Sequence, residues 1–351
     1  MDELSKNTPN TSANAHAFAA DVSVDYLVPS VAVCAAVQSA GDYPARDRDG
    51  MTELAYIGEI RHFAGVPHAL PGTSTNGQLL PIPQNTALFS VAGTVFGGDG
   101  KSNFSLPDLR GRTMLGTGQG IGLAEQVLGV PFGKTPPCLP LTYVILTQGI
   151  YPAADGREFG AHFTGQVVGF AGNYAPGGYK VADGSLLPIQ ENSELFELIG
   201  NTYGGDGVAT FALPDLRGRA VIGAGRGPDT TEWSLGQQAG VTNDNPAFKN
   251  SPPTLALNYL IAVQGTFPSP DGGMQGETYL GELTAFAGNF APGGWALANG
   301  QMMRIADNQA LYALLGTTFG GDGITTFALP DLRGRCVIGI SEADAWGSTR
   351  G

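Results

Sequence analysis

Short apolar segments, each broken by glycine or proline after a few residues, run along the whole chain and predict short β-strands. Residues 165–172, Gly-Gln-Val-Val-Gly-Phe-Ala-Gly, predict a strand that ends in a glycine-rich bend. The next residues, Asn-Tyr-Ala-Pro-Gly-Gly-Tyr at 173–179, predict a tight turn, because proline presets φ and glycine tolerates positive φ. Residues 181–189 then predict a hairpin with Asp183 and Gly184 at its bend.

A short helix is predicted directly after this hairpin. Asn192 suits the N-cap of the helix and Gly200 suits its C′ position. Leu195, Leu198 and Ile199 follow the spacing i, i+3, i+4 and form one apolar face. Because so short a helix is not stable alone in water, this face must dock on the sheet of its own repeat.

The whole pattern occurs three times in the chain. The string Leu-Pro-Asp-Leu-Arg-Gly-Arg stands at 106–112, 213–219 and 329–335. An aromatic residue followed by Gly-Gly-Asp-Gly stands at 96–100, 203–207 and 319–323. The helix pattern recurs at 308–316 and, more weakly, at 85–93. The chain is therefore predicted to be mainly β, with one short helix in each of three tandem units.

An apolar strand rich in β-branched residues precedes each repeat. Residues 143–149 and 259–265 are close matches, and residues 31–38 are a weaker relative. No further strand of this kind follows the third repeat. We therefore divide the chain into a polar leader and three units, each made of a strand and the repeat after it: 1–30, 31–140, 141–256 and 257–351.

Composition narrows the choice of partners. Glycine and proline supply 53 and 24 of the 351 residues and only 14% of residues are charged, which fits a turn-rich globular protein. The net charge of −13 argues against nucleic acid and anionic membranes, because both bind basic surfaces. No apolar run approaches the ~20 residues of a membrane-spanning helix, so membrane insertion is not expected. The acidic N-terminus lacks the pattern of a Sec signal.

The spacing of the cysteines indicates whether the chain is held together by disulfides or by zinc. Cys34, Cys138 and Cys336 lie far apart and form no Cys-x-x-Cys pair. A disulfide framework or a structural zinc site is therefore not expected.

Charge is scarce, but it is concentrated in the Leu-Pro-Asp-Leu-Arg-Gly-Arg strings. Six of the 18 basic residues are their arginines, and each string also carries an aspartate two positions before its first arginine. The residues are Asp108, Arg110, Arg112, Asp215, Arg217, Arg219, Asp331, Arg333 and Arg335. We expect a structural role, in which each guanidinium binds the aspartate and loop carbonyls and ties irregular backbone together. The alternative is a fork that binds a carboxylate or a sugar.

Two further sets of repeated residues allow two interpretations each. Asp99, Asp206 and Asp322 lie in the Gly-Gly-Asp-Gly turns, where a calcium loop would need several nearby oxygen ligands and each motif offers one carboxylate. We therefore expect these aspartates to bind amides of their own turns. Tyr179 and Trp295 follow the Pro-Gly-Gly turns. An exposed ring there would face a ligand such as a sugar, whereas a buried one would belong to the core, which we favour.

No pattern in the sequence indicates catalysis. His16, His62, His68 and His162 lie at non-equivalent positions of the repeats. The sequence contains no Gly-x-Ser-x-Gly elbow, no His-Glu-x-x-His motif and no phosphate-binding loop. We therefore expect a protein without catalytic residues, bound metal or cofactor.

Several strings together resemble one family. Gly-Glu-[Ile/Leu]-x-x-Phe-Ala-Gly, Ala-Pro-Gly-Gly-Trp, Ala-Asn-Gly-Gln, Gly-Gly-Asp-Gly and Leu-Pro-Asp-Leu-Arg-Gly-Arg resemble the phage tail collar domain family, and most of all its bacterial branch of microcystin-dependent proteins. Residues 281–340 carry the resemblance most fully and residues 165–224 nearly as well. The first repeat lacks the Pro-Gly-Gly-aromatic turn and has His-Ala-Leu-Pro-Gly-Thr-Ser at 68–74 instead.

The resemblance implies a non-catalytic structural subunit of a tail fibre, a tail-like particle or a surface appendage, which it reaches by a route other than Sec. Its partners would be copies of itself or neighbouring tail or appendage proteins. Phage members of the family assemble as trimers, and some hold a metal through a His-x-His motif that this sequence lacks. The alternative is an adhesin or receptor-binding protein that recognises surface glycans through the variable stretches 118–140 and 226–254.

The resemblance also raises a question about the apolar strands. In family members this strand follows its collar, which implies that strand 143–149 completes the first collar and strand 259–265 the second. Strand 31–38 is then left for the third collar. If it folds back within its own chain, the three collars close into a pseudo-threefold monomer. If it inserts into another copy, the chains join head to tail as a filament.

Overall fold

The computed structural model describes residues 29–45, 55–64, 73–131, 138–152, 162–239, 252–268, 278–340 and 348–350. In this part of the chain the fold is mainly β with three short α-helices, one per repeat, as the sequence predicts. The polar leader up to residue 28, with His16, and the His68 segment lie outside the described residues. None of the described helices has the length and apolar character needed to cross a membrane.

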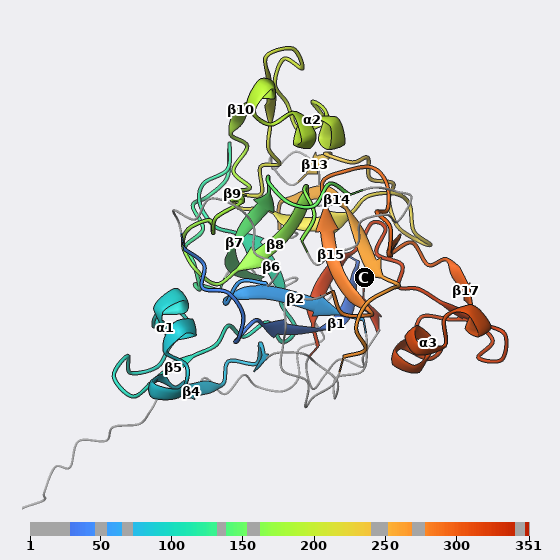
Figure 1. The fold of residues 1–351 in the computed structure, drawn as a ribbon, viewed down its shortest axis with the longest axis horizontal. Helices are drawn as coiled ribbons and strands as arrows, with labels where there is room; N and C mark the ends of the chain where they lie inside the picture. The colour runs from blue at the N-terminus through green and yellow to red at the C-terminus, as the bar shows by residue number, and fades with distance from the viewer. Residues whose placement is uncertain are drawn as a thin grey trace, which may run out of the picture.

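Three long strands form the frame of the molecule (Figure 1): β1 (Ser30–Val37), β7 (Cys138–Leu146) and β14 (Thr254–Ala262). They read as nearly continuous apolar runs because they are buried along almost their whole length. Each belongs to two repeats at once. Its first half pairs in parallel with the last strand of one repeat, and its second half pairs antiparallel with the first strand of the next.

The same pairing occurs at all three places. β7 lies between β6 (Thr113–Gly116) and β8 (Gln166–Phe170), and β14 lies between β12 (Ala220–Gly223) and β15 (Glu282–Phe286). β1 lies between β19 (Cys336–Gly339) and β2 (Glu59–Phe63). The N-terminal strand therefore folds back onto the third repeat of its own chain, and the three repeats close into a pseudo-threefold ring.

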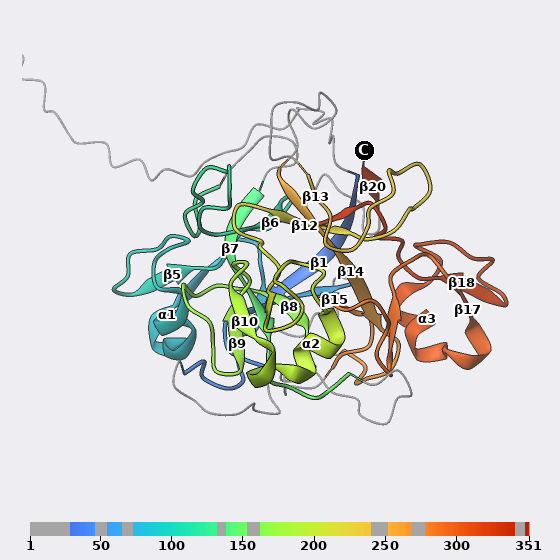
Figure 2. The same cartoon turned by 90° about the horizontal axis from the view of Figure 1, so that it is seen from above.

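Two triangles of strands surround the pseudo-threefold axis. β2, β8 and β15 each pair antiparallel with the other two. The last residues of β6, β12 and β19 form isolated bridges with the arginine-containing strings that precede the next of these strands: Gly116 with Arg217, Gly223 with Arg333 and Gly339 with Arg110. Figure 2 shows β6 and β12 on one side along the axis and β8 and β15 on the other, so the triangles are stacked.

Each repeat also carries a small lobe at a corner of the triangular molecule (Figure 1). A lobe consists of a two-stranded sheet, one turn of 3-10 helix and one α-helix. The sheets are β4 (Leu79–Pro81) with β5 (Asn103–Ser105), β10 (Leu186–Pro188) with β11 (Thr210–Ala212), and β17 (Met302–Arg304) with β18 (Thr326–Ala328). The 3-10 turns are η2 (Ile82–Gln84), η3 (Ile189–Glu191) and η5 (Ile305–Asp307), and the helices are α1 (Thr86–Ala92), α2 (Ser193–Ile199) and α3 (Gln309–Leu315).

The helices dock on their repeats as expected. Leu195, Leu198 and Ile199 pack with Phe211 and Leu257 in one core cluster. Asn192 occupies the N-cap of α2 as predicted, but the expectation that its side chain caps the helix is wrong: it donates instead to the carbonyl four residues earlier, at 3.0 Å. The 3-10 turn that leads into α2 determines this geometry, because it places the preceding carbonyl within reach.

The predicted hairpin at 181–189 is also wrong. β9 (Tyr179–Val181) pairs with the long strand β7, whereas β10 pairs with β11. The Asp183–Gly184 turn therefore joins the central frame to a lobe. Four remaining strands extend the frame: β3 (Thr73–Ser74), β13 (Gln238–Ala239), β16 (Trp295–Leu297) and β20 (Thr349–Arg350).

Candidate functional site

The Asp–Arg strings form the same bonded unit in every repeat. In the second repeat Arg217 holds the Asp215 carboxylate with two parallel bonds, from Nε at 2.9 Å and from Nη2 at 3.2 Å. Arg219 Nη1 approaches the same carboxylate at 3.3 Å and donates to the Asp215 carbonyl. Equivalent contacts occur in Asp108–Arg110–Arg112 and Asp331–Arg333–Arg335.

The two arginines of a string differ in burial. The Arg219 side chain is 2% exposed and burial lowers its pKa, whereas Arg217 is 34% exposed and its bonds to Asp215 raise its pKa. The two-bond edge of Arg217 is already occupied by Asp215. This geometry favours the structural interpretation over a fork that binds a ligand carboxylate.

Each string also joins its repeat to the preceding one. Gly218 N donates to Gly116 O at 2.8 Å, and Gly116 N donates to Arg219 O at 2.9 Å. The backbones approach so closely that a Cβ on Gly116 would lie 1.8 Å from the Leu216 carbonyl oxygen. The equivalent distances are 1.8 Å for Gly223 and 2.2 Å for Gly339, so glycine is needed at all three seams between repeats.

The aspartates of the Gly-Gly-Asp-Gly turns bind their own backbone. Asp206 Oδ1 accepts hydrogen bonds from the amides of Val208, Ala209 and Thr210 at 2.8 to 2.9 Å. These bonds lower the pKa of Asp206 to about 2, and similar bonds lower the pKa of Asp99 and Asp322. Among the described residues, no group of three or more His, Cys, Asp or Glu side chains is arranged to hold a metal ion.

Neither repeated aromatic residue faces solvent. Tyr179 is 6% exposed and its hydroxyl lies 2.9 Å from His162 Nδ1. Trp295 is 5% exposed and packs against Phe163, with the ring centres 5.4 Å apart. The alternative that Tyr179 and Trp295 face a ligand is therefore corrected: each ring packs against the frame, because its strand, β9 or β16, pairs with a long strand.

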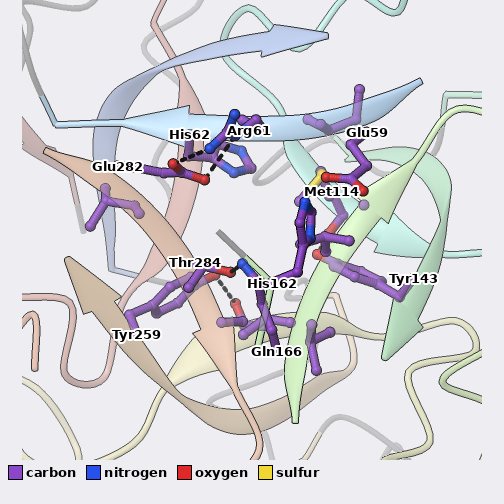
Figure 3. Close-up of a pocket in the computed structure, with 17 residues that line it drawn as sticks. Glu59, Arg61, His62, Met114, Tyr143, His162, Gln166, Tyr259, Glu282 and Thr284 are labelled. Atoms are coloured by element: carbon purple, nitrogen blue, oxygen red, sulfur yellow. Dashed lines mark hydrogen bonds and ion pairs between the residues drawn. The ribbon is translucent and has the colours of Figure 1, made fainter. Parts of the chain in front are cut away.

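A buried polar cluster lies where β2, β8 and β15 meet around the pseudo-threefold axis (Figure 3). It surrounds a cavity of about 20 Å³, which has room for one water molecule. The sequence did not predict this cluster, because His62 and His162 lie at non-equivalent positions of the repeats. The available signal was three polar residues, Glu59, Arg61 and His62, in a strand that also contains Ile60 and Phe63.

Equivalent positions at the three seams of this cluster carry different chemistry. Arg61 forms a buried ion pair with Glu282, with Nε to Oε1 at 2.8 Å. Gln166 Nε2 donates to Thr284 Oγ1 at 3.2 Å at the second seam.

At the third seam, the position corresponding to Arg61 and Thr284 is Val168. Glu59 there accepts bonds from the Tyr56 amide at 3.1 Å and from the Tyr179 hydroxyl at 3.3 Å. One seam is thus held by an ion pair and another by a neutral hydrogen bond. At the third seam, the carboxyl group of Glu59 is bound by Tyr56 and Tyr179.

Burial determines the protonation of this cluster. It raises the pKa of Glu59 to about 7, and it lowers the pKa of His62 to about 4 and that of His162 to about 3. Burial alone would lower the pKa of Arg61, but the Glu282 carboxylate raises it. At neutral pH the histidines are therefore neutral, and Glu59 is close to its titration point.

One known protein family matches the chain three times, once in each repeat. The family described as phage tail collar domain matches residues 58–114, 165–221 and 281–337, which are the three repeats. No curated protein and no solved structure matches the chain.

Proposed function

We propose that this chain is a non-catalytic structural subunit of a tail fibre, a tail-like particle or a surface appendage. With its three phage tail collar domains, it would occupy a site of threefold symmetry in that assembly. A phage tail collar domain marks a structural protein of the tail-fibre type. We also propose that the chain belongs to the microcystin-dependent branch of this family. The kind of particle that it joins is part of the same proposal.

The observation that carries the proposal is the closure of the ring within one chain. β1 completes the third collar in the way that β7 and β14 complete the first and second. Three chains with one collar each would present three lobes around a symmetry axis. This chain presents three similar lobes alone, so it suits a threefold partner as a monomer and needs no second copy.

The lobes offer matching contact points for such a partner. Leu79, Leu186 and Met302 occupy equivalent positions on the lobe sheets, and their exposed fractions are 59%, 60% and 55%. Exposed apolar side chains at three related positions favour a contact with neighbouring subunits around the same axis.

Mass and location together test the proposal. Light scattering on the purified full chain is expected to give a mass near 36.2 kDa at all concentrations. Immunogold labelling of particles from the native source is expected to place the chain at one threefold position. A trimer or filament in solution would contradict the monomeric ring, and a chain found only outside particles would contradict the structural role.

A second candidate function, recognition of surface glycans, is favoured by one observation. A cavity lined by amide and guanidinium groups lies between the second and third collars, where the stretch that follows the second collar begins. Such groups bind sugar hydroxyls.

A further inference from the structure

A cavity of about 190 Å³ lies at the seam between the second and third collars. Its walls come from the second collar at 223–225, from the long strand β14 at 258–259, and from the third collar at 297–299 and 332–333. An apolar protein cavity of roughly 150 Å³ holds benzene. This space therefore admits a six-membered ring, with part of the ligand remaining in solvent.

Three polar side chains in this wall have hydrogen-bonding groups with no partner among the described residues. Asn258 Nδ2 donates to Gly288 O at 2.7 Å, which leaves its Oδ1 free to accept. Asn299 Oδ1 accepts from Gln301 N at 3.2 Å, which leaves its Nδ2 free to donate. Arg333 binds Asp331 through Nε and Nη2, and its Nη1 has no partner in the same part of the structure.

The charge and shape of the wall indicate the class of ligand. The charge of Arg333 is balanced by Asp331 at 2.7 Å, so the wall does not favour an anion. One acceptor and several donors suit hydroxyl groups, each of which can donate and accept. Leu297 and the partly buried ring of Tyr259 provide apolar surface for the C–H groups of a sugar ring.

The equivalent place between the first and second collars is built differently. At the equivalent positions, Ala224 is replaced by Thr117, Asn258 by Thr142 and Asn299 by Asp183. Thr142 Oγ1 donates to Gly172 O at 2.7 Å, and the pKa of Arg217 is raised mainly by Asp215 and further by the negative charge of Asp183. That seam is therefore bonded within itself and acidic, and it provides a matched control.

We propose that the cavity between the second and third collars binds one neutral pyranose unit of a glycan, through Asn258, Asn299 and Arg333. The inference rests on the second candidate function and makes it specific. It is independent of the structural role, because mass and particle location do not depend on this cavity.

Saturation-transfer NMR on the full chain tests the inference. The probes are the methyl pyranosides of glucose, galactose, mannose and N-acetylglucosamine at about 10 mM, above the millimolar dissociation constants of weak sites. At least one is expected to receive saturation from the protein, and sodium benzoate, a charged ring of similar size, is not. No transfer to any pyranoside, or stronger transfer to benzoate, would overturn the inference.

Variants that copy the control seam locate the binding. Ala224→Thr narrows the cavity and Asn299→Asp replaces the free donor with a charge, so each is expected to weaken binding at least tenfold. The reciprocal change Asp183→Asn, in the other seam, is expected to leave binding unchanged. Thermal unfolding of each variant excludes misfolding as the cause. Undiminished binding in both correctly folded seam variants would overturn the assignment.

Discussion

The three outer seams are the places where the Asp–Arg string of one collar meets the glycine of its neighbour. They repeat the same contacts three times, whereas the axial cluster does not. At the outer seams each collar uses the same Asp–Arg unit and the same glycine against its neighbour. Around the axis, equivalent positions carry Glu59, Gln166 and Glu282. In a trimer of identical chains, one charged residue near the axis occurs three times and its copies repel each other. A fused chain avoids this constraint, so Arg61 of one collar can pair with Glu282 of another.

The two sets of contacts therefore have different roles in the fold. The repeated contacts define the ring geometry, and glycine is required in them because a Cβ atom there would overlap the backbone of the neighbouring collar. The axial contacts distinguish the collars, so that the first and third fit each other in a way that other pairs do not.

Removing residues 1–38 is expected to abolish folding. β1 is fully buried and fills the gap between β19 and β2, so its loss exposes two unpaired strand edges. We expect aggregation, measured as loss of soluble protein and of cooperative thermal unfolding. A peptide covering residues 29–38, added during refolding, should restore solubility. A deletion variant that folds as well as the full chain would refute closure by β1, and removal of residues 1–28 alone serves as the control.

Breaking the axial ion pair is expected to have the next largest effect. Glu282→Gln leaves the buried guanidinium of Arg61 without its carboxylate partner, which should destabilise the protein by about 3–5 kcal/mol in urea unfolding. Adding Arg61→Thr reproduces the Gln166–Thr284 pair of the second seam. The double variant should therefore recover at least half of the loss. If the double variant is as unstable as Glu282→Gln alone, the seams are not interchangeable.

At the outer seams, the loss of an aspartate should destabilise the protein more where that aspartate is more buried. Asp215→Ala removes the partner of two arginines and should reduce stability by roughly 2–4 kcal/mol. Asp331→Ala should be similar, because the two carboxylates are 12% and 18% exposed, while Asp108 at 32% should matter less. Unchanged melting temperatures in all three variants would show that the strings are surface forks.

The smallest effect is expected from Glu59→Gln, and it depends on pH. The pKa of Glu59 is raised from 4.5 to about 7, so the folded protein holds a proton that the unfolded chain has lost. The stability associated with this proton is present below pH 4.5 and is lost as pH rises through 7. Glutamine stays neutral, as Gln166 does at the equivalent position.

We therefore expect Glu59→Gln to equal the natural protein at pH 5 and to exceed it by on the order of 2 kcal/mol at pH 8, by urea unfolding at both values. His62 and His162, whose pKa values are lowered, act in the opposite direction, because stability is lost as pH falls below 6.5. Their contribution is common to both proteins and cancels in the difference. An equal gain at both pH values would contradict the assignment to Glu59.

Features that depend only on near neighbours along the chain follow from the amino-acid sequence. The three repeats, the helix faces, the bonds of Asp206 to amides two to four residues away and the pairing of Asp215 with Arg217 are all local. Local geometry follows from residue type and spacing, so these features could be predicted.

Tertiary structure alone decided which strands meet. The hairpin expected at 181–189 failed because β9 finds its partner in the frame and β10 in a lobe. The fold-back of β1 was one of two open alternatives, since strand pairing within and between chains uses the same hydrogen bonds. Arg61 and Glu282 lie 221 residues apart, and no spacing rule connects them. They meet because three collars close around one axis, where burial makes a partner necessary for each charge.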